Sequence, residues 1–144
     1  MMAEKKLFRF KVNADINELQ RVLDFIERCV QELDCPPKAK MRINVAVEEI
    51  FANITHYAYS DKMGEVVIES EINFEPKTVT ITFVDSGKKF DPLAKSDPDV
   101  TLSANDRQIG GLGIFMTKKF MDELSYEYRN GQNIFTMKKD LNCV

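Results

Sequence analysis

The sequence predicts a two-layer α+β domain in which helices cover one face of a mixed, mostly antiparallel sheet. One observation is a long helical pattern at residues 41–58, where apolar side chains recur every three or four positions. Another is a set of short alternating segments joined by brief links, which favours hairpins between neighbouring strands. The element order strand–helix–helix–strand–strand–loop–helix–strand–strand then favours one helical layer packed on one sheet.

The first half of the chain contains one expected strand and two expected helices. Residues 6–12 alternate as a strand does, and Asn13 or Asp15 can cap the helix that follows. Two consecutive prolines after Cys35 end that helix, and the second of them, Pro37, can open the central helix.

The second half contains a long aperiodic segment between regular elements. Residues 88–109 are rich in Pro, Asp, Ser and Asn, which predicts either a functional lid or a disordered segment. Asn130–Gly131 is a hairpin signal. The remaining expected elements are strands at 65–74 and 77–84, a helix at 114–124, and strands at 125–129 and 133–139. The first of these strands does not alternate cleanly.

Composition narrows the function classes. A chain of 144 residues with 44% hydrophobic residues predicts one folded domain over residues 1–144. Its net charge of −3 argues against a nucleic-acid-binding surface. Three cysteines without CxxC spacing and a single histidine make neither a disulfide framework nor a zinc site. This cysteine pattern favours the reducing cytoplasm as the location. No run is long and apolar enough for a membrane span.

The central helix carries an unusual polar stripe. Glu49, Asn53 and His56 share one face, and no lysine or arginine occurs from Ile43 through Asp61. Such a stripe indicates the lining of a pocket. A buried asparagine with satisfied hydrogen bonds beside a glutamate at the rim is the alternative, and on this helix alone we favour it.

The spacing of Glu49 and Asn53 nevertheless suits phosphate chemistry. Their side chains lie one helical turn apart and can reach a common small volume. Mg²⁺ prefers oxygen ligands and keeps several waters and phosphate oxygens, so Asn53 could be its main protein ligand. Glu49 could then accept a proton from a nucleophile.

A second motif, Asp85–Ser86–Gly87–Lys88–Lys89–Phe90–Asp91–Pro92, follows an expected strand. An aspartate there can accept a hydrogen bond from an exocyclic amine, and the glycine allows a planar ring to approach the backbone. Taken alone, an ordinary β-turn explains the motif better.

The third motif is Gly110–Gly111–Leu112–Gly113, which precedes a helix. Glycine-rich turns at helix N-termini present backbone N–H groups to phosphate. The segment matches neither the P-loop pattern nor GxGxxG, because Met116 stands where a third glycine is needed. A flexible hinge is an equal alternative for this motif alone.

Together the three motifs resemble the ATP-binding family that includes gyrase, histidine kinases, a heat-shock chaperone and a mismatch-repair ATPase. The resemblance is strongest to bacterial anti-sigma-factor serine/threonine kinases, from Ile16 to about Lys139. EEIFANITHYAY resembles their E-x-x-x-N-x-x-x-H-A helix, DSGKKFDP their adenine-binding DxGxxFDP, and GGLGIFMTKKFMDELSY their second glycine box.

The resemblance implies a role for each matching residue in a Bergerat-type ATP-binding fold. Glu49 matches the general base, Asn53 the Mg²⁺ ligand and Asp85 the adenine anchor. An arginine of the lid (residues 88–113) reaches the γ-phosphate in known kinases, and Arg107 is the arginine in that segment. We take His56, with Tyr57 between it and Ala58, as structural or as a contact to the helix and the lid, without a chemical role. The predicted nucleotide-binding residues are Asn53, Asp85, Gly87, Phe90, Gly110, Gly111, Leu112 and Gly113.

The implied function is an ATP- and Mg²⁺-dependent serine kinase that binds a sigma factor and phosphorylates a small antagonist protein. A homodimer is expected only by analogy with the family. The main alternative is a module of the same fold that binds ATP and a partner without phosphate transfer. A free histidine-kinase catalytic domain is the third hypothesis, disfavoured because we expect no dimerisation helix with a phospho-acceptor histidine.

Overall fold

The computed structural model describes residues 4–59, 63–94 and 111–142. The strands are β1 (Lys5–Asn13), β2 (Glu65–Phe74), β3 (Lys77–Asp85), β4 (Glu123–Arg129) and β5 (Gln132–Asp140). The α-helices are α1 (Leu19–Val30), α2 (Pro37–Asn53) and α3 (Gly111–Phe120). Short helical turns are η1 (Ile16–Glu18), η2 (Gln31–Leu33), the π-helical η3 (Ile54–Ala58) and η4 (Pro92–Ala94).

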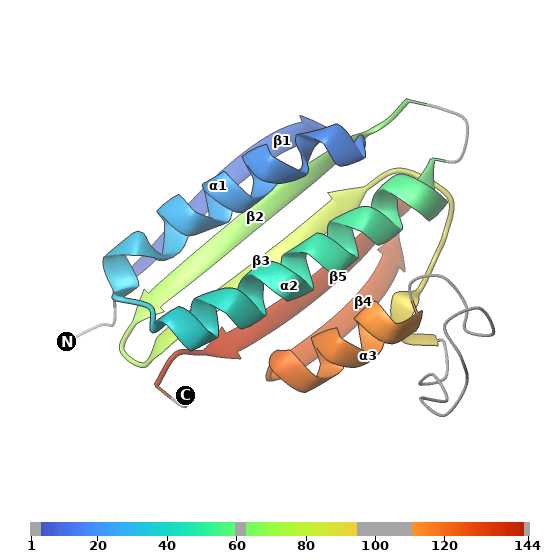
Figure 1. Cartoon of the computed structure of the whole chain (residues 1–144). Coiled ribbons are helices and arrows are strands. Elements are labelled where there is room, and N and C mark those ends of the chain that lie inside the picture. Colours follow the sequence, from blue (N-terminus) through green and yellow to red (C-terminus); the bar gives the residue numbers. More distant parts are fainter. Residues whose placement is uncertain (1–3, 60–62, 95–110, 143–144) are drawn as a thin grey trace.

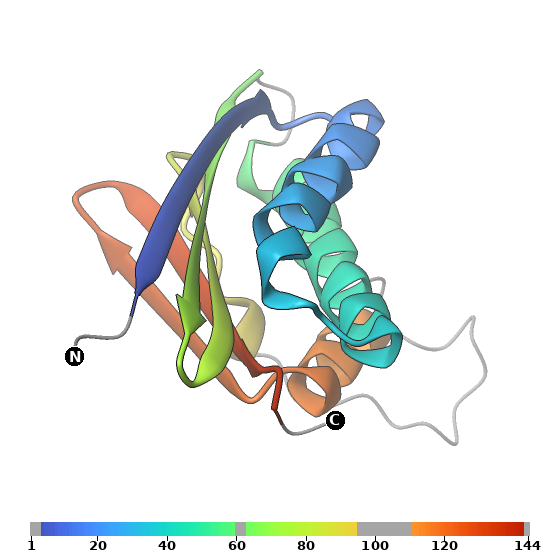
Figure 2. The same cartoon turned by 90° about the vertical axis from the view of Figure 1, so that its left-hand side faces the viewer.

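The five strands form one sheet in the order β1-β2-β3-β5-β4, and the three α-helices cover one of its faces (Figures 1 and 2). The predicted two-layer α+β fold is therefore confirmed. All four neighbouring strand pairs are antiparallel, so the described sheet has no parallel pair where a mixed sheet was expected. The reason is that β5 lies between β3 and β4, which run in the same direction but do not pair.

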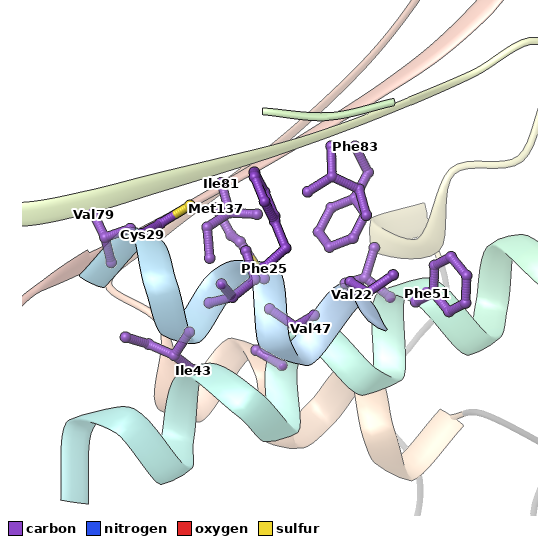
Figure 3. Packing of buried hydrophobic residues seen from close by; sticks show 14 of the residues in the cluster. Val22, Phe25, Cys29, Ile43, Val47, Phe51, Val79, Ile81, Phe83 and Met137 are labelled. Atoms are coloured by element: carbon purple, nitrogen blue, oxygen red, sulfur yellow. The ribbon is translucent and has the colours of Figure 1, made fainter. Parts of the chain in front are cut away.

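The core lies between the helical layer and the sheet (Figure 3). Helix α1 contributes Val22 and Phe25, α2 contributes Ile43 and Val47, and β3 contributes Phe83, all almost fully buried. The apolar stripe predicted on the central helix is thus confirmed. Packing against this core fixes the C-terminal end of α2 beside the end of β3, where the candidate site lies.

Strand β2 alternates more regularly than its sequence suggests. Val66, Ile68, Ser70 and Ile72 all face the helices and are fully buried. Ser70 is the polar member that obscured the pattern. It lies under α1 near Cys29, whose thiol pKa is raised to about 11 by burial and lowered in part by the Ser70 hydroxyl.

Most predicted element boundaries agree with the structure within two or three residues. Of the two candidate caps, Asp15 is the one that accepts a hydrogen bond from a helix-start amide, that of Asn17 at 2.9 Å. Helix α3 begins and ends earlier than the expected 114–124, because the chain leaves the helix after Phe120 to start β4. Within the described residues, no helix has the length and apolar character that crossing a membrane requires.

Candidate functional site

A cavity opens where the end of α2 meets the ends of β3 and β5. Its walls are mostly apolar, but three buried polar side chains, those of Asn53, Asp85 and Asn133, line it as well. The complete lining is Ile50, Asn53, Ile54, Ala58, Asp85, Phe90, Pro92, Tyr126, Asn133 and Phe135. A concave apolar site with a few convergent polar groups is typical of small-molecule binding.

Asp85 is the buried carboxylate of this cavity. It is the last residue of β3, and only 4% of its surface is exposed. Its Oδ1 accepts hydrogen bonds from the Gly87 amide at 3.0 Å and from Asn133 Nδ2 at 2.9 Å. Burial raises the pKa of the Asp85 carboxyl, while these two donors lower it. Within the described residues, both hydrogen bonds to the Asp85 carboxylate end on Oδ1. Oδ2 is therefore the oxygen that a hydrogen-bond donor of a ligand would meet.

Asn133 is a site residue that the sequence reasoning missed. The β3–β5 pairing places it directly opposite Asp85. Besides Asp85, its Nδ2 donates to the Lys88 carbonyl at 2.9 Å. Its Oδ1 accepts from the Phe90 amide at 3.1 Å and from the Tyr126 hydroxyl. A polar residue at an inward position of an alternating strand was the available signal.

The turn after Asp85 is tied to the end of η3, the π-helical turn that continues α2. The Lys88 amide donates to the Ala58 carbonyl at 2.6 Å, and the Ser86 amide donates to the Tyr59 hydroxyl at 2.8 Å. A Cβ at Gly87 would lie 2.2 Å from the Ala58 carbonyl oxygen. Gly87 is therefore required for this close backbone approach, a reason that adds to the one expected from the sequence.

Phe90 forms part of the cavity wall and is supported by a second aromatic ring. Tyr57 stacks on Phe90 with ring centroids 4.9 Å apart and planes 20° apart. Counting four residues on from Asn53 in the E-x-x-x-N-x-x-x-H-A motif reaches Tyr57, so Tyr57 occupies the motif's histidine position. His56 is exposed and does not line the cavity. The wider π-helical turn after Asn53 moves His56 off the face of Glu49 and Asn53.

Glu49 and Asn53 remain together on one face of α2. Asn53 is 5% exposed, and its Nδ2 donates to Glu49 Oε1 at 3.3 Å. Glu49 is half-buried. Since Nδ2 points toward Glu49, Oδ1 of Asn53 is the atom that a cation would bind. A neutral amide oxygen beside a carboxylate, at the edge of a cavity, fits the donor set of a magnesium ion shared with phosphate oxygens.

The glycine-rich motif is only partly within the described residues. Gly111, Leu112 and Gly113 form the first turn of α3, which packs against α2 (Figure 1). Gly110, Arg107 and the rest of the expected lid from residue 95 lie outside the described residues. The first turn of a helix carries unpaired backbone N–H groups, which suits an anion.

Comparisons with known proteins agree with this geometry. A family model described as the histidine kinase-like ATPase domain matches residues 12–139. The serine/threonine-protein kinase BtrW of Bordetella bronchiseptica is 26% identical over 100 residues, which cover 69% of this chain and 70% of that protein. The anti-sigma F factor of Thermoanaerobacter sp. is 28% identical over 90 residues, 62% of each chain.

A solved structure supports the fold. The crystal structure of the RsbU and RsbW domains of a Mycobacterium tuberculosis protein superposes with a TM-score of 0.66 at 16% identity. The match covers 94% of this chain but 32% of that longer one. The family model, in contrast, spans Glu49 and Asn53 on α2, the turn after Asp85, and Asn133 in a single match. Its description implies ATP as the bound nucleotide. The chain therefore belongs to the histidine kinase-like ATPase domain family.

Proposed function

We propose that the cavity binds the adenine of ATP and that the chain is an ATP- and Mg²⁺-dependent serine kinase. The observation that carries the proposal is the buried carboxylate of Asp85, which lines a mostly apolar cavity and lies two residues before Gly87. Adenine is flat and apolar on its faces and presents one amine at its edge. Such a base would bury its faces against Phe90 and Ile50 and donate its amine to Asp85.

The phosphate end would lie toward Asn53 and α3. Asn53 Oδ1 would hold the magnesium ion, and the first-turn amides of α3 at Gly111 and Gly113 would donate to phosphate oxygens. When bound, the ion supplies charge neutralisation of the transferring phosphoryl group. Arg107 is proposed to add a positive charge at the γ-phosphate.

Glu49 would act as the general base. It would accept the proton of a substrate serine hydroxyl as the serine oxygen bonds to the γ-phosphorus and the bond to the β–γ bridging oxygen breaks. Its position is set by Asn53, whose Nδ2 lies 3.3 Å from Glu49 Oε1. The same helix turn therefore fixes the base relative to the proposed metal ligand, which is the positioning that phosphoryl transfer requires.

Partners are proposed from the relatives. Their names, a serine/threonine-protein kinase and an anti-sigma F factor, support a sigma factor as the binding partner and a hydroxyl side chain as the phosphate acceptor. That this acceptor is a serine of an antagonist protein is proposed from the family resemblance. Such a regulator would work in the cytoplasm, and by the same analogy it would be a homodimer.

One observation favours a second candidate, a module that binds ATP and a partner without transfer. The Asn53–Glu49 hydrogen bond gives Glu49 a structural use, because it orients the amide of the metal ligand. In that case Glu49 needs only to accept a hydrogen bond.

The substitution Glu49→Gln separates the two functions. Glutamine keeps an oxygen that can accept from Asn53 but accepts no proton. For a kinase, transfer of labelled phosphate from ATP should fall by about 10²–10⁴-fold while ATP affinity, measured by calorimetry, stays near the original value. The acceptors to test are small proteins encoded beside the gene. Glu48→Gln, which changes an exposed neighbour on the same helix, is the matched control and should transfer normally.

ATP binding with no transfer by the unaltered protein would favour the binding module. Undiminished transfer by Glu49→Gln would remove Glu49 from the role of base and leave the nucleotide site standing.

A further inference from the structure

We propose that Asn133 is a positioning residue for nucleotide recognition: it aims Asp85 at the 6-amino group of adenine without touching the base itself. The inference rests on the proposed ATP-binding function and goes beyond it, because it assigns base selectivity to a strand that carries none of the three sequence motifs. Asn133 lies on β5, 48 residues from Asp85.

The hydrogen-bonding capacity of the Asn133 side chain is fully used. An asparagine side chain has two N–H donors and two acceptor lone pairs on its oxygen. Asn133 Nδ2 donates to Asp85 Oδ1 and to the Lys88 carbonyl, both at 2.9 Å. Its Oδ1 accepts from the Phe90 amide and the Tyr126 hydroxyl. With all four positions occupied, none remains for a direct bond to a base.

The orientation of the Asn133 amide is fixed by its partners. The Phe90 amide can only donate, and the Lys88 carbonyl can only accept. Exchanging the nitrogen and oxygen of Asn133 would therefore place like groups against each other at both contacts. The donor toward Asp85 follows from these two backbone contacts and from the carboxylate itself.

The contacts of Asn133 also restrict the orientation of the Asp85 carboxylate. Its Oδ1 is held by two donors, Asn133 Nδ2 and the Gly87 amide. A carboxylate held at one oxygen by two donors from different elements cannot rotate freely, so Oδ2 has a defined direction into the cavity. The same amide holds Lys88 and Phe90, which keeps the carboxylate and the Phe90 wall in a constant relation. Pre-organisation of this kind lowers the ordering cost of binding.

The test compares ATP with purine riboside triphosphate, which has the same sugar and phosphates but lacks the 6-amino group. The unaltered protein should bind ATP about ten- to hundredfold more tightly, as expected for one hydrogen bond to a charged group. In Asn133→Leu, which keeps a similarly branched shape without polar atoms, this preference should fall to within about threefold, because the Asp85 hydrogen bond is largely lost.

A control separates positioning from general loosening of the turn. Tyr59→Phe removes the acceptor of the Ser86 amide but leaves every contact of Asn133 in place. This variant should lower the affinity for both triphosphates by a similar factor and keep the preference for ATP. An Asn133→Leu protein that also weakens both equally and keeps the preference would overturn the proposal.

A second measurement uses the unaltered protein, so it tests the proposal even if Asn133→Leu fails to fold. In the nucleotide-free protein, the two Nδ2 protons of Asn133 should exchange with water far more slowly than those of exposed Asn17, as observed by NMR. Equally fast exchange would show that the two hydrogen bonds donated by Asn133 Nδ2 do not form. If the unaltered protein binds neither triphosphate, the proposed function fails and this inference fails with it.

Discussion

The two ends of the proposed nucleotide site are built in different ways. At the base end, the backbone amides of residues 86, 87, 88 and 90 all have partners, supplied by η3, by Tyr59 directly after it, by β5 and by Asp85. At the phosphate end, Glu49 and Asn53 come from one helix and share a single hydrogen bond of 3.3 Å. The base end is thus a product of tertiary structure, whereas the pairing of Glu49 with Asn53 follows from helical spacing.

The two ends should therefore be sensitive to substitution in different ways. Changes at the base end should alter stability and binding together, because the same contacts hold the fold and the pocket. Changes to Asn53 at the phosphate end should alter function more than folding, because within the described residues its side-chain hydrogen bond is the one to Glu49 on the same helix. Substitutions at the two ends test that division, and the largest effect is expected at the base end.

Gly87→Ala should break the base end. Its Cβ would meet the Ala58 carbonyl oxygen at 2.2 Å, so the turn must move away and lose the Lys88–Ala58 hydrogen bond. We expect a loss of about 2–4 kcal/mol in the free energy of unfolding, measured with urea, and weaker ATP binding. Gly131→Ala is the control: its φ is +77° but no atom lies within 4 Å, so only backbone strain of about 1 kcal/mol is expected. Equal losses in the two variants would contradict the close approach.

Much of this division could be foreseen from the sequence, and the reason is local. Glu49 and Asn53 are four residues apart on one helix, so their proximity follows from helix geometry. Asp85 ends a strand with clean alternation. Asn133 could not be assigned to Asp85, because their contact depends on which residues of β3 and β5 pair. Tyr126 could not be assigned to Asn133, because their contact depends in turn on the pairing of β4 with β5.

Other misses have equally specific causes. Ser70 hid the alternation of β2, since a buried hydroxyl on the core face looks polar in the sequence. His56 was expected on the face of Asn53, but a π-helical turn is not encoded by the apolar spacing from which helices are predicted.

Asn53→Ala should change function and leave stability nearly intact. With the amide removed, we expect the Mg²⁺-dependent part of the ATP affinity to fall by about tenfold. This corresponds to the loss of one metal–ligand contact that contributes roughly 1.4 kcal/mol to binding. Calorimetry with Mg²⁺ and with EDTA measures that part directly. Asn44→Ala, an amide deletion earlier on α2, should bind as the unaltered protein does. An Mg²⁺ effect that survives in Asn53→Ala would assign the metal to another ligand.

Tyr59→Phe tests the base end more gently. The Tyr59 hydroxyl donates to the Glu65 carbonyl at 2.7 Å and accepts from the Ser86 amide, so it joins the start of β2 to the Asp85 turn. Its removal should cost about 1 kcal/mol of folding stability in urea denaturation. Tyr128→Phe, at a 41% exposed tyrosine, should cost almost nothing. If Tyr59→Phe left the folding stability unchanged, water would have replaced the hydroxyl at both backbone groups.

The smallest effect should have the opposite sign. Burial raises the pKa of Asp85 above its value in the unfolded chain, so the folded protein holds this proton more tightly. The carboxyl therefore favours folding below the unfolded pKa, near 4, and that contribution is lost as the pH rises through the folded pKa. At neutral pH the buried charge is a cost. Asp85→Asn keeps an oxygen that can accept from Gly87 and Asn133, and it removes the charge.

Asp85→Asn should thus gain on the order of 0.5–1 kcal/mol of stability at neutral pH while losing ATP affinity, a stability–function trade-off at a binding site. Urea unfolding at neutral pH and near pH 4 checks the sign, because the gain should shrink toward acid. Asp24→Asn, at an exposed carboxylate on α1, should show no such pH-dependent gain. A destabilised Asp85→Asn protein at neutral pH would mean that Asn133 and Gly87 more than compensate the buried charge, so that the base end favours the ionised carboxylate even without nucleotide.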